Sequence, residues 1–389
     1  MKLRIKIEAV FVALVLLFCG GLGMLTADNH KKWSEMEWRN YTQFPQLDWK
    51  SLFDMKYLKQ LETAFTDQIQ YREQFVHQYY SLMHSCGLSY LKHVVGKEDQ
   101  LFGVPLIPDD LEKRKSELIA AAELVNEEAA KIAALGKTFI YIHFPRKDTV
   151  MEEYLPWYYP ISHEAEEIAL FREHLSDDVV FINAYELFLQ NQEEGPFYYQ
   201  TDHHANFDGA MLVYHDLIKI VSNHYPAIPK YTKADYTLAL RRMDGTYNRT
   251  IGRIIIPDEE PLNVVSSPSL SYQRWDMDKE SDQPIFGDQN TYSSAYMGGD
   301  FGHTLIKTTQ NDGPSFLISG LSFTNILEAL VLPVCRSMES LDYRYLNVEE
   351  TLYDYAAACD AEYVVFVPST STVSIGLSYI RQQLGLAVK

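Results

Sequence analysis

Short apolar runs alternate with helical patterns through most of the chain after residue 94. Runs of four or five apolar, β-prone residues are typical of strands that are buried on both faces of a sheet, and they occupy 138–142, 179–182, 315–318 and 363–367. Helical spacing is found at 110–134, 163–175, 206–224, 323–332 and 348–358. This alternation predicts an α/β domain, 94–389, with helices flanking a parallel sheet. Asp109 or Asp110 can cap its first long helix, and Gly136 can end that helix.

Residues 228–300 interrupt this rhythm. They are rich in Tyr, Asp, Ser and Gly, and their one apolar run is 254–256. We interpret the segment as an insertion of strands and loops into the α/β domain.

The N-terminal segment determines the expected location of the protein. Lys2, Arg4 and Lys6 precede a run without charge, 9–27, and this length is close to the ~20 residues that cross a bilayer as a helix. The basic start favours an N-terminus inside and the remainder outside. Residues 1–27 are therefore predicted to be a cytoplasmic tip and an uncleaved transmembrane anchor of a single-pass cell-membrane protein. A buried core helix is the alternative.

Residues 28–93 are predicted to be a juxtamembrane helical segment. Pro45 lies in its polar first part, and apolar residues then recur at intervals of three and four from Leu52 to Met83. This spacing predicts an amphipathic helix that packs on its own domain or on a partner.

Composition narrows the class of partner. The formal net charge is −19, which argues against nucleic acid, whose phosphates require Lys and Arg, and against an anionic lipid surface. The 27 Tyr suit sugar surfaces or ordinary packing at the core and rim. The four Cys match no metal motif, and we expect neither a metal nor another cofactor.

The run Thr201-Asp202-His203-His204 is the first candidate for chemistry, and it precedes a predicted helix. An Asp two residues before a His suits the base half of a nucleophilic triad, in which the carboxylate fixes the imidazole and the imidazole takes the proton. Two other interpretations are open at this point. Asp202, His203, His204 and Asp208 are potential metal ligands, and Asp202 is also a potential helix cap.

Ser322 is the second candidate. A strand ends at Gly320, and Ser322 stands at the start of the next helix, where unpaired N–H groups favour a developing negative charge. Ser is also a favoured N-cap, so this signal needs a base beside it. Gly298-Gly299-Asp300 is the third candidate, because Gly299 permits close backbone approach to a substrate. An ionised Asp300 has no proton to donate.

In their order along the chain, these features resemble the DHHW family, which is related to the AlgX/AlgJ-type polysaccharide O-acetyltransferases with an SGNH-hydrolase-like fold. The resemblance runs from the anchor to the final strand. It includes Pro145-Arg146-Lys147 after the first strand and Asp342-Tyr343-Arg344-Tyr345 after the Ser322 helix. It implies an SGNH-hydrolase-like parallel sheet with flanking helices, preceded by one transmembrane helix and an amphipathic helix.

The resemblance also implies roles. Ser322 is the nucleophile, His204 the general base and Asp202 its orienter. The resemblance assigns no such role to His203, which we interpret as shaping the loop. The candidates for oxyanion or substrate binding are Gly299, Asp300, Lys147, Arg344 and His203. The expected function is an extracytoplasmic O-acetyltransferase, or acetylesterase, that acts on a cell-envelope or secreted polysaccharide through an acyl-enzyme. The expected donor partner is a membrane-bound O-acyltransferase.

Three departures from the family pattern accompany the resemblance. Ala205 stands where the family carries Trp, Leu321 where it carries Asp, and Asp300 where it carries Asn. Asp300 in place of Asn removes an amide donor worth several kcal/mol of transition-state stabilisation. The alternative function is therefore a catalytically degenerate accessory protein, which binds glycan or scaffolds a membrane-bound O-acyltransferase system.

Overall fold

The computed structural model describes residues 2–27, 30–34, 36–37, 39–46, 54–88, 92–105, 110–346, 349–368 and 377–386. The helices are α1 (Lys2–Ala27), α2 (Met55–Gln68), α3 (Arg72–Ser85), α4 (Leu111–Ala134), α5 (Lys147–Val150), α6 (Glu164–Glu173), α7 (Ala184–Gln190), α8 (Phe207–Val221), α9 (Thr246–Thr250), α10 (Tyr292–Ala295), α11 (Thr324–Val331), α12 (Leu352–Ala358) and α14 (Leu377–Gln383). Leu52, Asp109 and Val348, at which predicted helices begin or are capped, lie outside the described residues.

The strands are β1 (Trp33–Ser34), β2 (Arg39–Asn40), β3 (His93–Val95), β4 (Leu101–Gly103), β5 (Thr138–His143), β6 (Val179–Asn183), β7 (Thr237–Arg242), β8 (Glu259–Ser266), β9 (Tyr272–Asp276), β10 (Lys279–Glu280), β11 (His303–Thr308), β12 (Ser315–Gly320), β13 (Ser337–Leu341) and β14 (Tyr363–Val367). The chain divides into two compact units. Unit 1 comprises residues 1–93 and 246–255, and unit 2 comprises 94–245 and 256–389.

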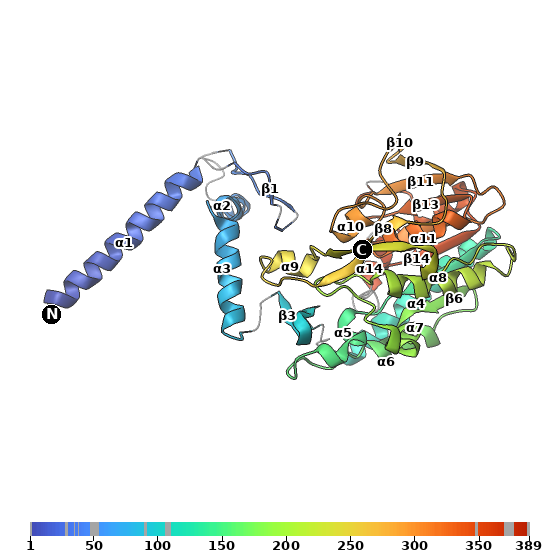
Figure 1. The fold of residues 1–389 in the computed structure, drawn as a ribbon, viewed down its shortest axis with the longest axis horizontal. Coiled ribbons are helices and arrows are strands. Elements are labelled where there is room, and N and C mark those ends of the chain that lie inside the picture. The colour runs from blue at the N-terminus through green and yellow to red at the C-terminus, as the bar shows by residue number, and fades with distance from the viewer. Residues whose placement is uncertain are drawn as a thin grey trace. The chain divides into compact units, whose positions relative to one another are not determined.

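The centre of unit 2 is an eight-stranded sheet in the order β10-β9-β11-β13-β12-β14-β5-β6 (Figure 1). The strands from β13 to β6 are parallel, as predicted. The prediction of a wholly parallel sheet is wrong for β9, β10 and β11, which pair antiparallel. Strands joined by short hairpins pair antiparallel, and β9 and β10 belong to the insertion.

The inner parallel strands β5, β12 and β14 are largely apolar, because helices cover both faces of the sheet. In β5, Ile140 and Ile142 pack into one core with residues of α7, α8 and α11. Phe139 and Tyr141 alternate with them and pack into a second core with α4, α6, α12 and α14. Successive side chains of a strand point to opposite faces, so a continuous apolar run fills both cores. Asp110 caps α4 by accepting the N–H groups of Glu112 and Lys113.

In unit 1, the single amphipathic helix predicted for 52–83 is divided into α2 and α3. Tyr71 adopts a left-handed conformation with φ 63°, which ends any continuous helix. Asp67, at the end of α2, is clamped by the Arg39 guanidinium at 2.6 and 2.9 Å. Leu58, Leu61 and Phe65, apolar residues of the predicted amphipathic helix, are exposed.

The N-terminal helix α1 carries the segment predicted to be a membrane anchor. Within the described part of the chain, no helix meets the length and apolarity needed to cross a membrane. The predicted anchor is therefore not confirmed.

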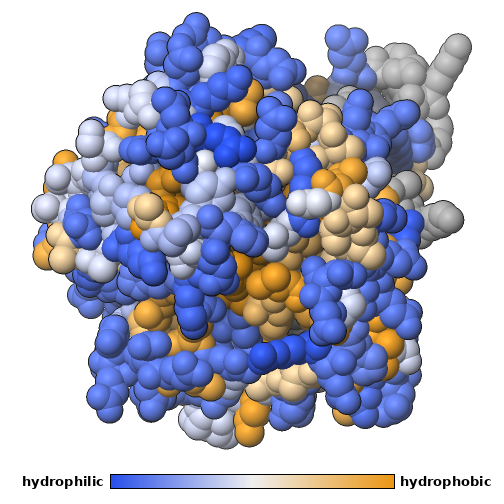
Figure 2. Space-filling view, turned by 90° about the vertical axis from the view of Figure 1, so that its right-hand side faces the viewer, coloured by the Kyte–Doolittle hydropathy of each residue, from blue (hydrophilic) through white to orange (hydrophobic). Residues whose placement is uncertain are grey.

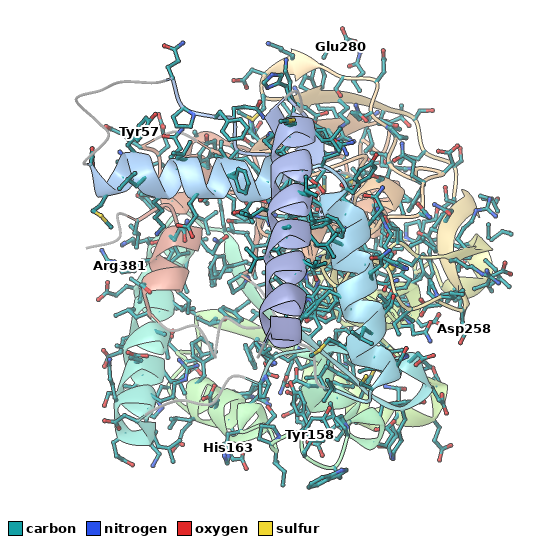
Figure 3. The ribbon with its side chains drawn as sticks, turned by 90° about the vertical axis from the view of Figure 1, so that its left-hand side faces the viewer. Tyr57, Tyr158, His163, Asp258, Glu280 and Arg381 are labelled. Atoms are coloured by element: carbon teal, nitrogen blue, oxygen red, sulfur yellow. The ribbon has the colours of Figure 1, made fainter. Side chains whose placement is uncertain are left out.

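The surface of the protein is mixed in polarity. On the face drawn in Figure 2, hydrophobic residues gather in a hollowed central area among hydrophilic ones. On another side, Tyr158 and His163 project from the segment before α6 (Figure 3), and the neighbouring Trp157 is 95% exposed. Single exposed apolar residues are ordinary on protein surfaces, so exposure alone assigns no function to these positions.

Candidate active site

The turn after β12 places Ser322 at the carboxyl end of the parallel sheet. Every residue of β12 is buried, and Gly320 ends the strand so close to β14 that a Cβ would lie 2.2 Å from the Val367 carbonyl oxygen. Only glycine fits there. The chain then turns, and Ser322 lies two residues before α11 with 8% of its surface exposed. A nucleophile and a helix start are thus combined at one edge of the sheet.

Asp202 and His204 come from the tight turn that leads into α8. The turn is closed by a bridge between Tyr198 and Ala205 and followed by Asn206, which caps α8 by accepting the Gly209 N–H at 3.0 Å. Asp202 and His204 are both buried. The turn therefore holds the Asp202 carboxyl group and the His204 imidazole in fixed positions that are shielded from solvent.

The structure joins the three predicted residues in one relay. The Nδ1 of His204 lies 2.6 Å from Oδ1 of Asp202, and its Nε2 lies 2.8 Å from Oγ of Ser322. The same Asp202 oxygen accepts the N–H groups of His203 and His204 at 2.7 and 3.0 Å. A buried carboxylate that orients an imidazole toward a serine hydroxyl can activate that hydroxyl as a nucleophile.

Aromatic rings fix the plane of the His204 imidazole. Tyr292 stacks on it with centroids 3.8 Å apart and an interplanar angle of 4°. Phe323 and His203 lie 4.7 and 4.0 Å from it, centroid to centroid. The imidazole can therefore rotate little about its long axis, and its two nitrogens stay directed at Asp202 and Ser322.

His203 lies at the opening of this cluster. Its side chain is 31% exposed, and its Nδ1 is 3.2 Å from Oδ1 of Asp202. Asp202, His203 and His204 could in principle hold a metal ion. However, Oδ1 of Asp202 already faces three hydrogen-bond donors, and Nε2 of His204 faces Ser322. A cation at this position would have to replace these hydrogen bonds.

Lys147, a candidate for substrate binding, lies beneath the turn instead of at a surface. It is 3% exposed, and its ammonium donates to the carbonyl oxygens of Tyr199 and Gln200, both at 2.7 Å. Burial lowers the pKa of Lys147 to about 7, although the charges of Glu260 and Asp202 act in the opposite sense. Lys147 therefore supports the backbone that carries Asp202 and His204.

Glu260, in β8, completes this support. Its carboxylate accepts the Gln200 N–H at 2.9 Å. Burial raises the pKa of Glu260 to about 7, partly offset by that N–H and by Lys147. The sequence pattern marks neither Glu260 nor Tyr292, because both lie in the insertion, which has no regular periodicity.

The Gly298–Asp300 loop reaches the Ser322 helix through Asp300. Oδ1 of Asp300 accepts the Asn325 side-chain amide at 2.8 Å, and Arg344 approaches Oδ2 at 3.7 Å. Arg344 is held mainly by Asp342, at 2.5 Å. Gly299 has φ 139°, a conformation that favours glycine. Asp300 thus acts as a hydrogen-bond acceptor, and the Arg344 guanidinium is paired with the carboxylates of Asp342 and Asp300.

The comparisons with known proteins agree with this architecture. The solved structure of Bacillus cereus PatB1 with a sulfonyl adduct has 20% sequence identity and a TM-score of 0.61, covering 74% of this chain and 98% of its own. A DHHW family protein from Eubacterium siraeum has 19% identity and a TM-score of 0.59, covering 76% of this chain and 95% of its own. A search of curated proteins gives no match.

The sequence itself also matches a family model. The model describes an SGNH hydrolase-like domain of the acetyltransferase AlgX, and it matches residues 94–304, which is more than half of the 389 residues. The matched range includes β5, the Asp202–His204 turn and the Gly298–Asp300 loop. The chain belongs to this family of AlgX-type SGNH hydrolase-like acetyltransferase domains.

Proposed function

We propose that the protein is an extracytoplasmic O-acetyltransferase that transfers acetyl groups to hydroxyls of a cell-envelope or secreted polysaccharide. The observation that carries this proposal is the hydrogen-bonded relay of Asp202, His204 and Ser322 in a domain of the AlgX type. Acetylesterase activity is the same reaction with water in place of the sugar hydroxyl.

The first half of the reaction forms an acyl-enzyme. The Oγ of Ser322 attacks the carbonyl carbon of an acetyl ester while Nε2 of His204 takes the hydroxyl proton. Asp202 stabilises the resulting imidazolium, which then gives the proton to the departing alcohol. The products are acetyl-Ser322 and the free alcohol of the donor.

The second half transfers the acetyl group. A sugar hydroxyl attacks acetyl-Ser322, and His204 takes its proton and returns it to Oγ as the ester bond to Ser322 breaks. The developing oxyanion needs N–H donors. Asp300 accepts a hydrogen bond from Asn325, so backbone N–H groups at Ser322 and in the Gly298–Asp300 loop are the donors in this proposal.

The acetyl donor and the location belong to the same proposal. A membrane-bound O-acyltransferase would supply the acetyl group, and the reaction would take place on the outer side of the cell membrane, with the N-terminal segment as anchor. The charge-free run 9–27 after three basic residues supports this location.

Ser322→Ala tests the proposal. We expect it to abolish both hydrolysis of p-nitrophenyl acetate and acetyl transfer to an oligosaccharide followed by mass spectrometry, since loss of the nucleophile costs a factor of about 10⁶ in a comparable triad. Phenylmethylsulfonyl fluoride should add one sulfonyl group to the wild type and none to the variant. Ser222→Ala, at the far end of α8, is the matched control and should keep activity and labelling. Full activity in Ser322→Ala would refute the proposal.

A second function, a non-catalytic accessory protein that binds glycan, is favoured by Ala205, Leu321 and Asp300, which depart from the family pattern. It predicts that the sulfonyl reagent leaves Ser322 unmodified while polysaccharide is still bound. Labelling of Ser322 with turnover of the ester would exclude it.

A further inference from the structure

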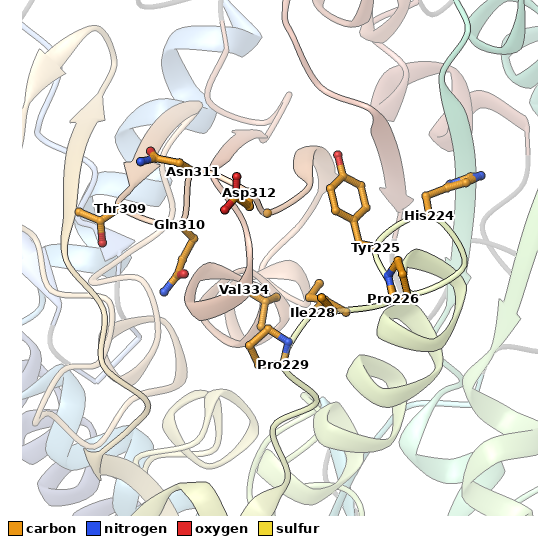
Figure 4. A pocket seen from close by; sticks show the side chains of 12 residues that line it. His224, Tyr225, Pro226, Ile228, Pro229, Thr309, Gln310, Asn311, Asp312 and Val334 are labelled. Carbon is orange, nitrogen blue, oxygen red and sulfur yellow. The ribbon is translucent and has the colours of Figure 1, made fainter.

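A cavity of about 560 Å³ lies at the amino ends of the parallel strands, opposite the edge that carries Ser322. Its walls are the segment 224–229 after α8, the turn 309–313 before β12, and Val334 before β13. Figure 4 shows Tyr225 on one side and Gln310, Asn311 and Asp312 on the other, with Ile228, Pro229 and Val334 below them in the view. The volume lies within the roughly 300–1,000 Å³ of small-ligand sites.

One ion pair holds both walls of this cavity. Arg336 pairs with Glu362 at 2.9 Å. The same guanidinium donates to the Gly313 carbonyl oxygen at 3.0 Å on one wall and to the Tyr225 hydroxyl at 3.4 Å on the other. The Tyr225 hydroxyl in turn donates to Glu362 at 2.5 Å. The cavity is therefore preformed, and its aromatic ring is fixed.

The chemistry of the lining favours an uncharged, hydroxyl-rich ligand. The ring of Tyr225 offers a flat apolar surface. The side chains of Gln310, Asn311 and Asp312 make no hydrogen bond within the described part of the chain, so two amides and a carboxylate are available to hydroxyl groups. Among the residues that line the cavity there is no lysine or arginine, and His224 is bonded to the Tyr363 hydroxyl. Arg336, which is bonded to both walls, is already paired with Glu362, so an anionic ligand would meet Asp312 with no unpaired cation among the lining residues.

We propose that this cavity is a second glycan-binding subsite, which holds a neutral segment of the polysaccharide away from Ser322. The assignment rests on the proposed function for its choice of ligand. The flat ring would pack against the C–H face of a sugar, and the amides and the carboxylate would bind its hydroxyls.

The test is calorimetric titration of the full chain with hexamers of N-acetylglucosamine, of glucose and of galacturonate. We expect at least one neutral hexamer to bind the wild type, and the variant Gln310→Ala/Asn311→Ala to bind it about tenfold more weakly, because two side-chain hydrogen-bonding groups are lost. The control variant Gln192→Ala/Gln382→Ala removes two exposed amides elsewhere and should bind like the wild type. Equal binding by the two double variants, binding of galacturonate alone, or no binding of either neutral hexamer would overturn the proposal.

The same variants separate this proposal from the proposed function. Gln310→Ala/Asn311→Ala should hydrolyse p-nitrophenyl acetate at the wild-type rate, because the small ester needs only Ser322. Ser322→Ala should lose that hydrolysis and keep binding of the hexamer. If hydrolysis fails to depend on Ser322 while the hexamer still binds at the cavity, the catalytic proposal falls and the subsite stands. If hydrolysis depends on Ser322 while no neutral hexamer binds at the cavity, the subsite proposal falls and the catalytic proposal stands.

Discussion

At the scale of single residues, Lys147 contributes through the backbone it holds. Its ammonium is a donor to two carbonyl groups of the turn that carries Asp202 and His204. A buried carbonyl that loses its donor costs about 1–3 kcal/mol, and 1.36 kcal/mol changes a rate about tenfold. The turn should therefore relax when Lys147 is removed.

Lys147→Met is expected to lower kcat about tenfold or more and to change KM little, because the relay loses its alignment while the substrate still binds. The measurement is steady-state hydrolysis of p-nitrophenyl acetate. Lys137→Met is the matched control, since Lys137 also donates to two backbone carbonyl groups, at Ala356 and Cys359, away from the relay. It should lower Tm and keep kcat. An unchanged kcat in Lys147→Met would contradict the positioning role.

The residues of the relay could be predicted from sequence because their order along the chain is specific and each stands at the end of a predicted element. The role of Lys147 could not, because it depends on where two carbonyl groups point. Tyr292 and Glu260 were also beyond prediction. Their positions against His204 and Gln200 follow from how the insertion folds back, which its irregular polar pattern does not encode.

At the scale of elements, β12 and the turn after it set the position of Ser322. Gly320→Ala would drive a Cβ against the Val367 carbonyl oxygen, 2.2 Å away, so β12 and β14 must separate. We expect a lower Tm and a large loss of kcat, because such overpacking costs about 1–3 kcal/mol and also moves Ser322. Thermal unfolding and p-nitrophenyl acetate hydrolysis measure the two effects.

Gly313→Ala separates the loss of stability from the displacement of Ser322. Its Cβ would lie 2.4 Å from the Val334 carbonyl oxygen, at the opposite end of β12. It should lower Tm in a similar way but leave ester hydrolysis by the folded protein intact. If both variants keep kcat, the position of Ser322 does not depend on the end of β12.

The strands buried on both faces were predictable, and the others were not. β5, β6, β12 and β14 are continuous apolar runs. β13 reads Ser-Met-Glu-Ser-Leu, whose polar residues hide its place in the sheet, and β11 and β9 follow from antiparallel pairing with no marked turn sequence. The break between α2 and α3 depends on Tyr71, which has no sequence signature of a left-handed residue.

At the scale of the whole molecule, the two units should respond differently to acid. In unit 1, burial alone would raise the pKa of Asp67, but the hydrogen bonds from Arg39 and from the Thr42 N–H lower it to about 2. A carboxylate with a lowered pKa stabilises the fold above its unfolded pKa and loses this contribution as the pH falls. The window for Asp67 is therefore about pH 4 down to 2.

Asp67→Asn is expected to speed hydrogen exchange of peptides from 39–42 and α2 at pH 6, and the difference from the wild type should shrink as the pH falls below 4. Exchange in β12 and β14, in unit 2, should be the same in both proteins. Glu62→Gln, an exposed change on α2, serves as the control. A difference that persists undiminished at the acid end would contradict the role of the Asp67 carboxylate.

The length of β12 also sets the distance between the cavity and Ser322. The strand begins beside the cavity at Ser315 and ends at Gly320, just before Ser322, and its six residues of extended chain span about 20 Å. A glycan held at the cavity must therefore extend at least that far, along the surface, before one of its hydroxyls meets acetyl-Ser322. Short oligosaccharides could occupy one place or the other, whereas long chains could occupy both. Acetylation should then become more efficient with chain length, and acetyl groups should be spaced along the polymer rather than crowded at its end.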